Sequence, residues 1–405
     1  MLPRVPGRIS FLEAMIAPLE LEVRASEPER VNLLIPRIEL RHLFGGYIAK
    51  FNLARRLAER GIRTRLVCVL PVGRLPGDWM RRVESYRGLA GLFENVEVAF
   101  ARDADRPLPV NPRDSFLATT WWTAHAARHA LERLERARFV YLIQEFEPFT
   151  YAMGTHAALA RQTYEFPHRA LFSTEFLRQY FRRHGIGVFA RGDSEGERDS
   201  ISFQNAITPL RAPSERSLAQ REPRRLLFYA RREMHATRNM FELGVLALSR
   251  AVAEGAVGSD WEIHGIGAVA GSPRVALGGG RVMRILPRRD QDSYARLLES
   301  HDVGLSLMHT PHPSLVPIEM AAAGMLAVTN TFENKTPEAL TRISENLVAV
   351  EPTLEGVVDG LRHAVADAGD VQRRVRGADV EWSADWDSAL DEEVMRGVAS
   401  FLATS

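Results

Sequence analysis

Apolar residues in the first part of the chain form short blocks separated by a stretch with helical spacing. Residues 31–36 read VNLLIP and residues 64–70 read TRLVCVL, two runs of strand character. Between them, apolar side chains recur at helical spacing over residues 48–58, a glycine pair precedes them and Gly61 follows. The order strand, glycine loop, helix, strand predicts a βαβ unit, and therefore a parallel sheet.

The same alternation continues to about residue 185. Further strands are predicted at residues 96–100, 115–120, 138–144 and 169–172. Helices are predicted at residues 123–136, 155–163 and 173–185. We therefore expect a first α/β domain over residues 29–210.

A second βα series follows a change in composition. Residues 190–224 are rich in Arg, Ser, Asp, Glu and Pro, so we place a linker within residues 205–223. Strands are then predicted at residues 225–230, 261–264, 281–286, 303–308, 326–329 and 347–350. Helices are predicted at residues 239–253, 290–299, 316–323 and 354–368. This series predicts a second α/β domain over residues 222–381.

The two ends of the chain lie outside these domains. Residues 1–28 form an N-terminal extension with a short amphipathic helix, which either packs on the first domain or touches a membrane surface. Residues 382–405 contain a helix, which either crosses back to the first domain or caps its own. The chain lacks an apolar run long enough to span a membrane, and its N-terminus does not resemble a signal peptide, so we expect a cytoplasmic protein.

Charge and composition narrow the classes of function. The formal net charge is +1, which argues against a dedicated nucleic-acid binder. Fifty of the 52 basic residues are arginine, and the two lysines are Lys50 and Lys335. Cys68 is the single cysteine, so a disulfide within the chain and a cysteine-based zinc site are excluded. The histidines show no metal-ligand spacing, and we expect neither a metal nor a cofactor.

The strongest chemical signal lies in residues 309–330, HTPHPSLVPIEMAAAGMLAVTN. They follow a predicted strand and read as loop, helix, glycine and strand. Backbone N–H groups near Ser314 and Leu315, at the start of this helix, can bind a diphosphate. Glu319, one turn further, can accept hydrogen bonds from ribose hydroxyls. The alternative is an ordinary βαβ connection with a surface glutamate.

This stretch resembles the donor site of GT-B glycosyltransferases of family 4. Glu319 matches the second glutamate of the family motif, whereas the first falls at Pro311, which leaves the identity of the donor sugar open. In residues 228–239, Arg231 matches the family arginine, and Arg238 is the basic residue nearest to the family lysine. The resemblance implies that these cations neutralise the departing diphosphate.

The resemblance also implies the remaining donor residues. Gly265 begins a Gly-Ile-Gly sequence similar to the glycine turn of the family, and Arg288 follows a strand at the expected edge of the cleft. The catalytic residues would be Arg231, Arg288 and Glu319. The donor-binding residues would be Arg231, Arg232, Arg238, Gly265, Leu286, Arg288, His312, Pro313, Ser314, Leu315, Val316 and Glu319.

An acceptor site is expected on the first domain. There the sequence HLFGGYIAKFNLARRLAERG resembles the N-terminal glycine loop and helix of the family, with Gly45, Gly46 and Tyr47 at the loop. Glu145 and Glu147 end a predicted strand and can bind acceptor hydroxyls, or act as a base if the enzyme inverts. The alternative for the two glutamates is a helix-capping or surface role.

Taken together, residues 30–390 resemble bacterial rhamnosyltransferases that build surface and S-layer glycans from dTDP-L-rhamnose. The resemblance implies the GT-B fold, two Rossmann-like α/β domains facing each other across a cleft. It implies transfer of L-rhamnose from dTDP-L-rhamnose to a glycan or a lipid-linked saccharide, with retention and with peripheral membrane contact. A nucleotide-sugar epimerase of the same fold and a non-catalytic nucleotide-binding scaffold remain alternatives.

Overall fold

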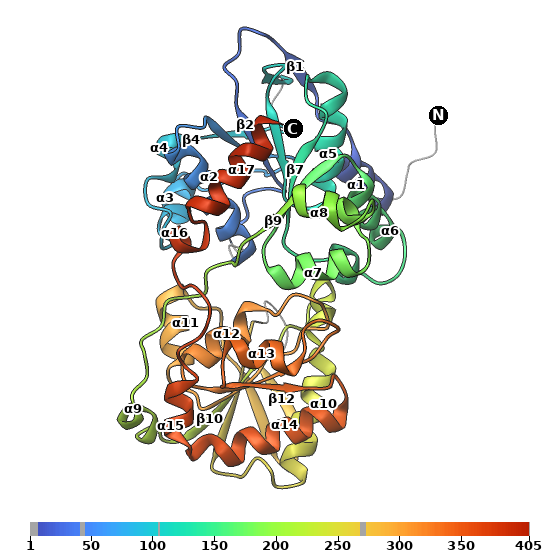
Figure 1. Ribbon diagram of the computed structural model, residues 1–405. Helices are drawn as coiled ribbons and strands as arrows, with labels where there is room; N and C mark the ends of the chain where they lie inside the picture. Colours follow the sequence, from blue (N-terminus) through green and yellow to red (C-terminus); the bar gives the residue numbers. More distant parts are fainter. Residues whose placement is uncertain (1–6, 41–44, 104–105, 268–272, 405) are drawn as a thin grey trace. The chain divides into compact units, whose positions relative to one another are not determined.

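The computed structural model describes residues 7–40, 45–103, 106–267 and 273–404 (Figure 1). The chain divides into two compact units. The first contains residues 1–205 and 386–405, and the second contains residues 206–385. Each unit is built on its own seven-stranded sheet.

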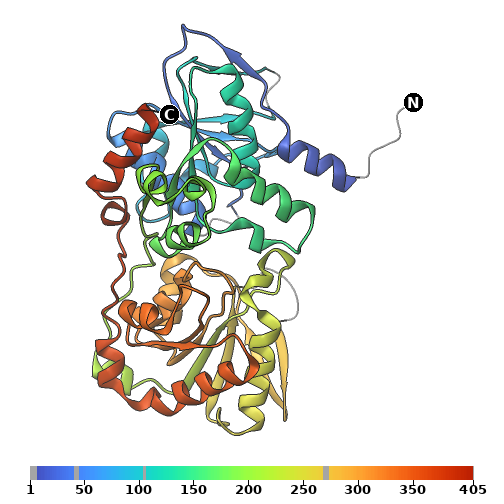
Figure 2. The same ribbon diagram turned by 45° about the vertical axis from the view of Figure 1, so that its right-hand side comes forward.

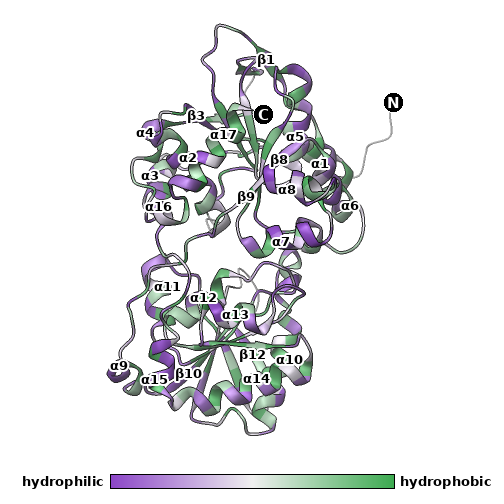
Figure 3. Cartoon of the chain, in the orientation of Figure 1, coloured by the Kyte–Doolittle hydropathy of each residue, from purple (hydrophilic) through white to green (hydrophobic). Residues whose placement is uncertain are grey.

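The sheet of the first unit is parallel throughout, as the βαβ pattern predicted. Its strands, in spatial order, are β4 (Val96–Phe100), β3 (Thr64–Cys68), β2 (Val31–Ile35), β6 (Ser115–Ala118), β7 (Phe139–Ile143), β8 (His168–Phe172) and β9 (Ser200–Ser202). Strands β2, β3 and β7 are buried at every residue, which explains why most of their side chains are apolar. Figure 3 colours each residue by its hydropathy, with hydrophobic residues in green.

Helices cover both faces of this sheet, as right-handed crossovers require. Helix α2 (Gly45–Glu59) packs with α4 (Leu92–Asn95) on one face, and α5 (Trp121–Ala130) packs with α6 (Thr155–Gln162) on the other (Figure 1). The unit also contains α3 (Trp79–Glu84), α7 (Glu175–Arg183) and α8 (Asp193–Arg198). Its 3-10 turns are η2 (Leu131–Arg133), η3 (Glu147–Thr150), η4 (Thr163–Glu165) and η5 (Gly187–Phe189).

The N-terminal extension packs on the first unit. Helix α1 (Gly7–Ile16) contacts α5, so the packing alternative holds for this helix. Next, β1 (Leu21–Val23) pairs in parallel with β5 (Leu108–Val110) in a separate two-stranded sheet. The sequence analysis did not predict these two strands, because three residues are too few to show a period.

The C-terminal segment also belongs to the first unit. It forms α16 (Trp386–Ala389) and α17 (Glu392–Ala403), and α17 contacts α2 and β9 (Figure 2). The Ser115 hydroxyl donates to the carbonyl of Leu402 at 2.9 Å. Of the two arrangements left open for this segment, the structure therefore shows the crossing from the second unit to the first. The helical part begins at Trp386 rather than just after residue 383.

The sheet of the second unit is parallel except at one edge. In spatial order its strands are β12 (Arg274–Gly278), β13 (Arg281–Ile285), β11 (Trp261–Ile266), β10 (Arg224–Tyr229), β14 (Val303–Leu305), β15 (Leu326–Asn330) and β16 (Leu347–Val350). Only the β12–β13 pairing is antiparallel. These two strands form a hairpin whose turn has positive φ at residues 278–280, which the triple glycine accommodates.

Helices again lie on both faces. Helices α10 (Phe241–Ala253) and α14 (Leu354–Ala366) pack together on one face, and α12 (Leu315–Ala322) packs against β15 on the other (Figure 1). The unit also contains α9 (Glu215–Ala219), α11 (Gln291–Leu298), α13 (Pro337–Ile343) and α15 (Val371–Arg376). Its 3-10 segments are η6 (Met234–Asn239) and η7 (Asp367–Gly369).

Most of the expected linker belongs to the second unit. The unit begins at residue 206, and α9 lies within the stretch that we assigned to the linker. Arg221 donates to the carbonyl of Ala323 at 3.0 Å, and the backbone N–H of Arg211 donates to Glu299 at 3.1 Å. These hydrogen bonds attach the stretch to the second unit, so it is not a free connection.

Candidate functional site

The expected donor residues lie at one edge of the second sheet. Strands β10, β11, β13 and β14 are parallel, so their carboxyl ends meet at the same edge. Arg231 follows β10, Gly267 follows β11, Arg288 follows β13, and the loop of residues 306–314 follows β14. Ligands of open α/β sheets bind at this edge.

The loop of residues 306–314 leads directly into α12. Ser314 precedes the helix with φ of 66°, which is uncommon for a residue other than glycine, and its N–H donates to His312 Nδ1 at 3.0 Å. Ser314 is buried, whereas Leu315 and Val316 are half-buried. Leu315 and Val316 are therefore the accessible residues at the start of α12, because Pro313 is buried as well.

Several hydrogen bonds hold this loop in place. Asn330 accepts from the N–H of Met308 at 2.6 Å and donates to its carbonyl at 3.1 Å. The ammonium of Lys335 donates to the same carbonyl at 2.7 Å, and Lys335 is fully buried. The N–H of His309 donates to the carbonyl of Arg238 at 2.8 Å. The loop before α12 is thus rigid and attached to the loop after β10.

Three of the four arginines predicted at the donor site lie on the segment that follows β10. Arg231 donates to Glu233 at 2.8 Å and to the Tyr229 hydroxyl at 3.3 Å. Burial lowers the pKa of Arg231, but Tyr229 and Glu233 outweigh it, so that the pKa is raised. Arg238 donates to the carbonyl of His235 at 3.0 Å, and the Arg232 guanidinium lies 5.8 Å from the ring of Phe241.

The other two predicted positions on this edge are more open. Leu286 is half-buried, and its N–H donates to the carbonyl of Gly265 at 2.8 Å, which extends the pairing of β11 and β13. Arg288 is exposed. Both residues therefore belong to the same edge as Arg231.

His312 is a buried neutral group. Burial and the positive charges of Lys335 and Arg238 lower its pKa to about 3. Its Nδ1 accepts from Ser314, so the ring proton resides on Nε2. Two cations and a helix start therefore surround His312, an arrangement that favours an anionic ligand.

Glu319 is not the surface glutamate of the alternative interpretation, because only 7% of it is exposed. One carboxylate oxygen accepts from the N–H of Thr208 at 2.9 Å, and the other accepts from the Tyr294 hydroxyl at 3.0 Å. Burial raises the pKa of Glu319, and these hydrogen bonds oppose the increase. Glu319 thus joins α12 to α11 and to the segment before α9.

The glycine that the backbone requires is Gly267 rather than Gly265. Gly265 lies within β11, where a Cβ would stand 2.5 Å from Cδ1 of Ile285, so its role in the structure is close packing. Gly267 has φ of +101°, and a Cβ there would lie 2.7 Å from the Tyr229 ring and 3.0 Å from Cδ of Arg231. Sequence reasoning chose Gly265 because dihedral angles are not visible in a glycine pair.

We predict that Gly267→Ala lowers transfer at least about tenfold, because the new methyl group would displace Tyr229 and Arg231 together. The left-handed backbone would add a stability cost of about 1–2 kcal/mol. Gly279→Ala is the matched control, since Gly279 also has positive φ but a Cβ there meets nothing within 4 Å. Initial-rate assays and thermal unfolding of both variants test this. Equal transfer by the two variants would contradict it.

The predicted acceptor residues lie at the corresponding edge of the first sheet. Gly45, Gly46 and Tyr47 open α2, and the carbonyl of Gly46 accepts from the Gln144 side chain at 3.2 Å. Glu145 and Glu147 follow β7, and the carbonyl of Glu145 accepts from the Tyr164 hydroxyl at 3.3 Å. The carboxyl ends of the parallel strands of this sheet therefore bring all five predicted residues to one edge.

Glu147 has the helix-capping contact that was its alternative role. Its Oε2 accepts from the N–H of Trp121, the first residue of α5, at 2.8 Å. Its own N–H donates to the Tyr164 hydroxyl at 3.1 Å. A carboxylate has about four lone-pair positions, so this cap is compatible with further hydrogen bonds from a ligand.

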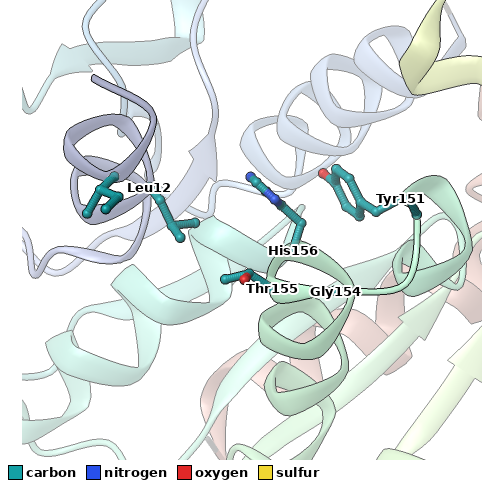
Figure 4. Close-up of a pocket in the computed structure, with 7 residues that line it drawn as sticks. Leu12, Tyr151, Gly154, Thr155 and His156 are labelled. Carbon is teal, nitrogen blue, oxygen red and sulfur yellow. The ribbon is translucent and has the colours of Figure 1, made fainter. Parts of the chain in front are cut away.

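A cavity of about 370 Å³ lies near this network and was not predicted. Residues from α1, from the loop after η3 and from the start of α6 line it, among them Leu12, Tyr151 and His156 (Figure 4). The Tyr151 hydroxyl accepts from the Trp121 indole N–H at 3.0 Å, and Tyr151 stacks on His156. The cavity is thus connected to Glu147 through Trp121.

Neither a metal cluster nor a membrane-spanning helix is found where the structure describes the chain. Among those residues, no group of three or more His, Cys, Asp or Glu could hold a metal ion. Within the same ranges, every helix is too short or too polar to cross a membrane.

Comparison with known families identifies both halves of the chain. The N-terminal domain of WsaF matches residues 30–175, and the C-terminal domain of WsaF matches residues 224–362, together well over half of the chain. The chain belongs to the WsaF family. The matched ranges contain all of the candidate donor residues and all of the candidate acceptor residues.

A curated relative and two solved structures are also similar to this chain. The O-antigen biosynthesis protein RfbC of Myxococcus xanthus is 30% identical over 88% of this chain, which spans only 26% of the length of that relative. Anabaena HepE in complex with UDP and glucose matches with a TM-score of 0.60 and 12% identity, covering 93% of this chain and 100% of HepE.

WaaG, a glycosyltransferase involved in lipopolysaccharide biosynthesis, matches with a TM-score of 0.53 and 12% identity, covering 93% of this chain and 99% of WaaG. These likenesses and the two parallel-sheet units confirm the predicted GT-B glycosyltransferase fold. Membership of family 4 and the rhamnosyl specificity stay predictions.

Proposed function

We propose that this WsaF-family protein is a glycosyltransferase that moves L-rhamnose from dTDP-L-rhamnose to a glycan or lipid-linked saccharide. The observation that carries the proposal is the loop of residues 306–314. This loop enters α12 beside Arg238, and Lys335 is buried beneath it. A helix start flanked by cations suits the diphosphate of a nucleotide sugar. The name of RfbC, which refers to O-antigen biosynthesis, and the UDP bound to HepE support this class of reaction.

The proposed chemistry is stabilisation of a leaving group. When the bond between the sugar and the diphosphate breaks, negative charge grows on the diphosphate oxygen. Arg231 and Arg288 neutralise this charge together with the N–H groups near Leu315, and the same oxygen accepts the proton of the acceptor hydroxyl. Charges that already stand in position need no rearrangement when the leaving group departs. The hydrogen bonds of Asn330 and Lys335 to Met308 hold the loop in its position.

The choice of dTDP-L-rhamnose rests on the resemblance of residues 30–390 to surface-glycan rhamnosyltransferases. Glu319 would hold the ribose through its carboxylate, in addition to its bonds from Thr208 and Tyr294. The acceptor would bind at the edge that carries Gly46, Tyr47 and Glu147, and an acceptor with a lipid carrier would bring the protein to a membrane surface.

We expect dTDP to raise the thermal midpoint of the protein more than UDP or GDP does. Binding to the folded state alone stabilises a protein by about 2.7 kcal/mol when the ligand is at 100 times its Kd. Thermal shifts with the three nucleotides, each at the same concentration, give the ranking. A larger shift with UDP or GDP would contradict the dTDP assignment.

A turnover assay distinguishes the proposed transfer from the two alternatives. The protein would be incubated with dTDP-L-rhamnose and a rhamnosyl acceptor, and in parallel with a nucleotide sugar that is a substrate for epimerases. Transfer to the acceptor supports the proposal. Interconversion of nucleotide sugars would identify an epimerase, and nucleotide binding without turnover would identify a scaffold.

A further inference from the structure

The cavity of about 370 Å³ on the first unit has few polar groups in its wall. Leu12 of α1 lies on one side of it, across from Thr155 and His156 of α6 (Figure 4). The described residues that line it include none with a carboxylate, an ammonium or a guanidinium group. A saccharide in such a cavity would leave several hydroxyls without a hydrogen-bond partner, whereas a hydrocarbon chain needs no partner. The lining therefore favours a hydrocarbon ligand.

Large apolar side chains continue from the cavity to its rim. Ile9, which lines the cavity, is 48% exposed, and Phe11 on the same helix is 55% exposed. On the other side, Met153 lies in sequence between the lining residues Ala152 and Gly154 and is 98% exposed. Exposed apolar side chains that gather around one cavity indicate a binding site. A long apolar ligand can thus extend from the cavity along this rim.

The cavity adjoins the candidate acceptor edge of the first sheet. Tyr151 lines the cavity, and its hydroxyl accepts from the Trp121 indole N–H at 3.0 Å. The backbone N–H of the same tryptophan donates to the Glu147 carboxylate at 2.8 Å. Trp121 is fully buried, and the ring of His156 packs edge to face on it with centroids 6.2 Å apart. A single fixed side chain therefore joins the cavity to the edge where the acceptor is expected.

We propose that this cavity binds the hydrocarbon chain of the lipid carrier to which the acceptor saccharide is attached. The inference rests on the proposed function, and it names the part of the acceptor that the first unit recognises in addition to the sugar. Because only Trp121 separates Tyr151 from Glu147, the hydrocarbon begins close to the reactive sugar. The acceptor is then a short saccharide on its lipid rather than a long glycan.

The test compares acceptors that differ only in the length of their hydrocarbon chain. Methyl rhamnoside and octyl rhamnoside would be used, the latter below its critical micelle concentration. Each CH₂ group that becomes buried changes affinity on the order of fourfold. We therefore expect kcat/KM for octyl rhamnoside to exceed that for methyl rhamnoside at least about tenfold, while KM for dTDP-L-rhamnose is the same with both. An equal kcat/KM for the two acceptors would overturn the inference.

Three variants locate this effect in the cavity. Leu12→Asp places a charge in the wall, and Thr155→Trp fills the space, so each should reduce the ratio of the two kcat/KM values to about one. Met153→Ser removes apolar surface from the rim and should lower the ratio several-fold. Because Met153 is almost fully exposed, this variant decides the question even if Leu12→Asp does not fold. A wild-type ratio in all folded variants would overturn the inference.

Met80→Ser is the matched control for Met153→Ser. Met80 is an exposed methionine of α3 in the same unit, and it is not among the residues that line the cavity. The ratio of the two kcat/KM values should therefore equal that of the wild type. An equal loss in Met80→Ser and Met153→Ser would show a general effect of surface hydrophobicity and would overturn the inference.

Calorimetry with the two rhamnosides, in the absence of donor, separates this inference from the proposed function. Tighter binding of octyl rhamnoside that is lost in Thr155→Trp, without any transfer, would support the cavity and overturn the proposed reaction. Transfer to methyl rhamnoside without any effect of chain length would overturn the cavity alone.

Two other occupants of the cavity would give different results. A methyl trisaccharide that binds more tightly than methyl rhamnoside, with a gain that Thr155→Trp abolishes, would identify a saccharide and overturn the inference. Sedimentation of the wild type with vesicles of phosphatidylethanolamine and phosphatidylglycerol, lost in Thr155→Trp, would identify a bilayer lipid instead of the carrier and would also overturn it.

Discussion

Replacing Arg231 by alanine is expected to lower kcat by about 10²–10³, because in the proposed mechanism the guanidinium stabilises charge that appears only as the diphosphate departs. Arg231 is well placed for this, since Glu233 and Tyr229 orient it at the carboxyl end of β10. Binding of the ground-state donor should change less than turnover does. Steady-state kinetics with dTDP-L-rhamnose and an acceptor would measure both effects.

The control for this prediction is Arg250→Ala. Arg250 lies on the outer face of α10, where it pairs with Glu254 and Glu355, and exposed pairs of this kind contribute little to stability. We expect its kcat to equal that of the wild type. If Arg231→Ala kept wild-type turnover, or if both variants lost it equally, Arg231 would not act on the leaving group.

Leu390→Ala is expected to destabilise the first unit by about 2–5 kcal/mol, the range found when a buried leucine is truncated. Leu390 is fully buried, and with Met395, Val398 and Leu402 it belongs to the core of the first unit. This segment is separated in sequence from the rest of that core by the entire second unit. Chemical denaturation followed by tryptophan fluorescence and circular dichroism would measure the loss.

Glu393→Ala provides the control, since Glu393 is an exposed residue of the first turn of α17. Its effect should stay within about 0.5 kcal/mol. A chain with two units need not unfold in a single step. The unfolding transitions measured by fluorescence and by circular dichroism should therefore be compared with each other. If Leu390→Ala matched the wild type, the C-terminal segment that contains Leu390 would not contribute to the core of the first unit.

The strands that the sequence predicts best are those buried on both faces. Residues 31–35 and 64–68 are entirely buried, and most of their side chains are apolar, although Asn32, Thr64 and Arg65 are buried with them. Strand β12, with its exposed arginine and glycine ends, carries no such run and was not predicted. Local hydrophobic patterns therefore reveal the centre of a sheet better than its edges.

The candidate site was predictable as a set of loops but not as a set of contacts. Parallel strands place their following loops at one edge, so the order of elements indicated the positions of Arg288 and Ser314, whereas Arg231 came from the resemblance to a known family. The bonds of Glu319 to Thr208 and Tyr294 join residues 111 and 25 positions away. No local sequence pattern marks Thr208 or Tyr294 as a partner of Glu319, because they come close to Glu319 only when the chain folds.

The sequence by itself determined the two α/β units, the glycine pair at the start of α2 and the helix start before Glu319, since all of these follow from periods and spacings along the chain. Only the tertiary structure decided that α17 joins the first unit, and that Lys50 and Lys335 are buried beside the two edges. An amphipathic helix needs an apolar surface but does not specify which one. Likewise, the charge of a lysine does not reveal its surroundings, which chain segments distant in sequence create.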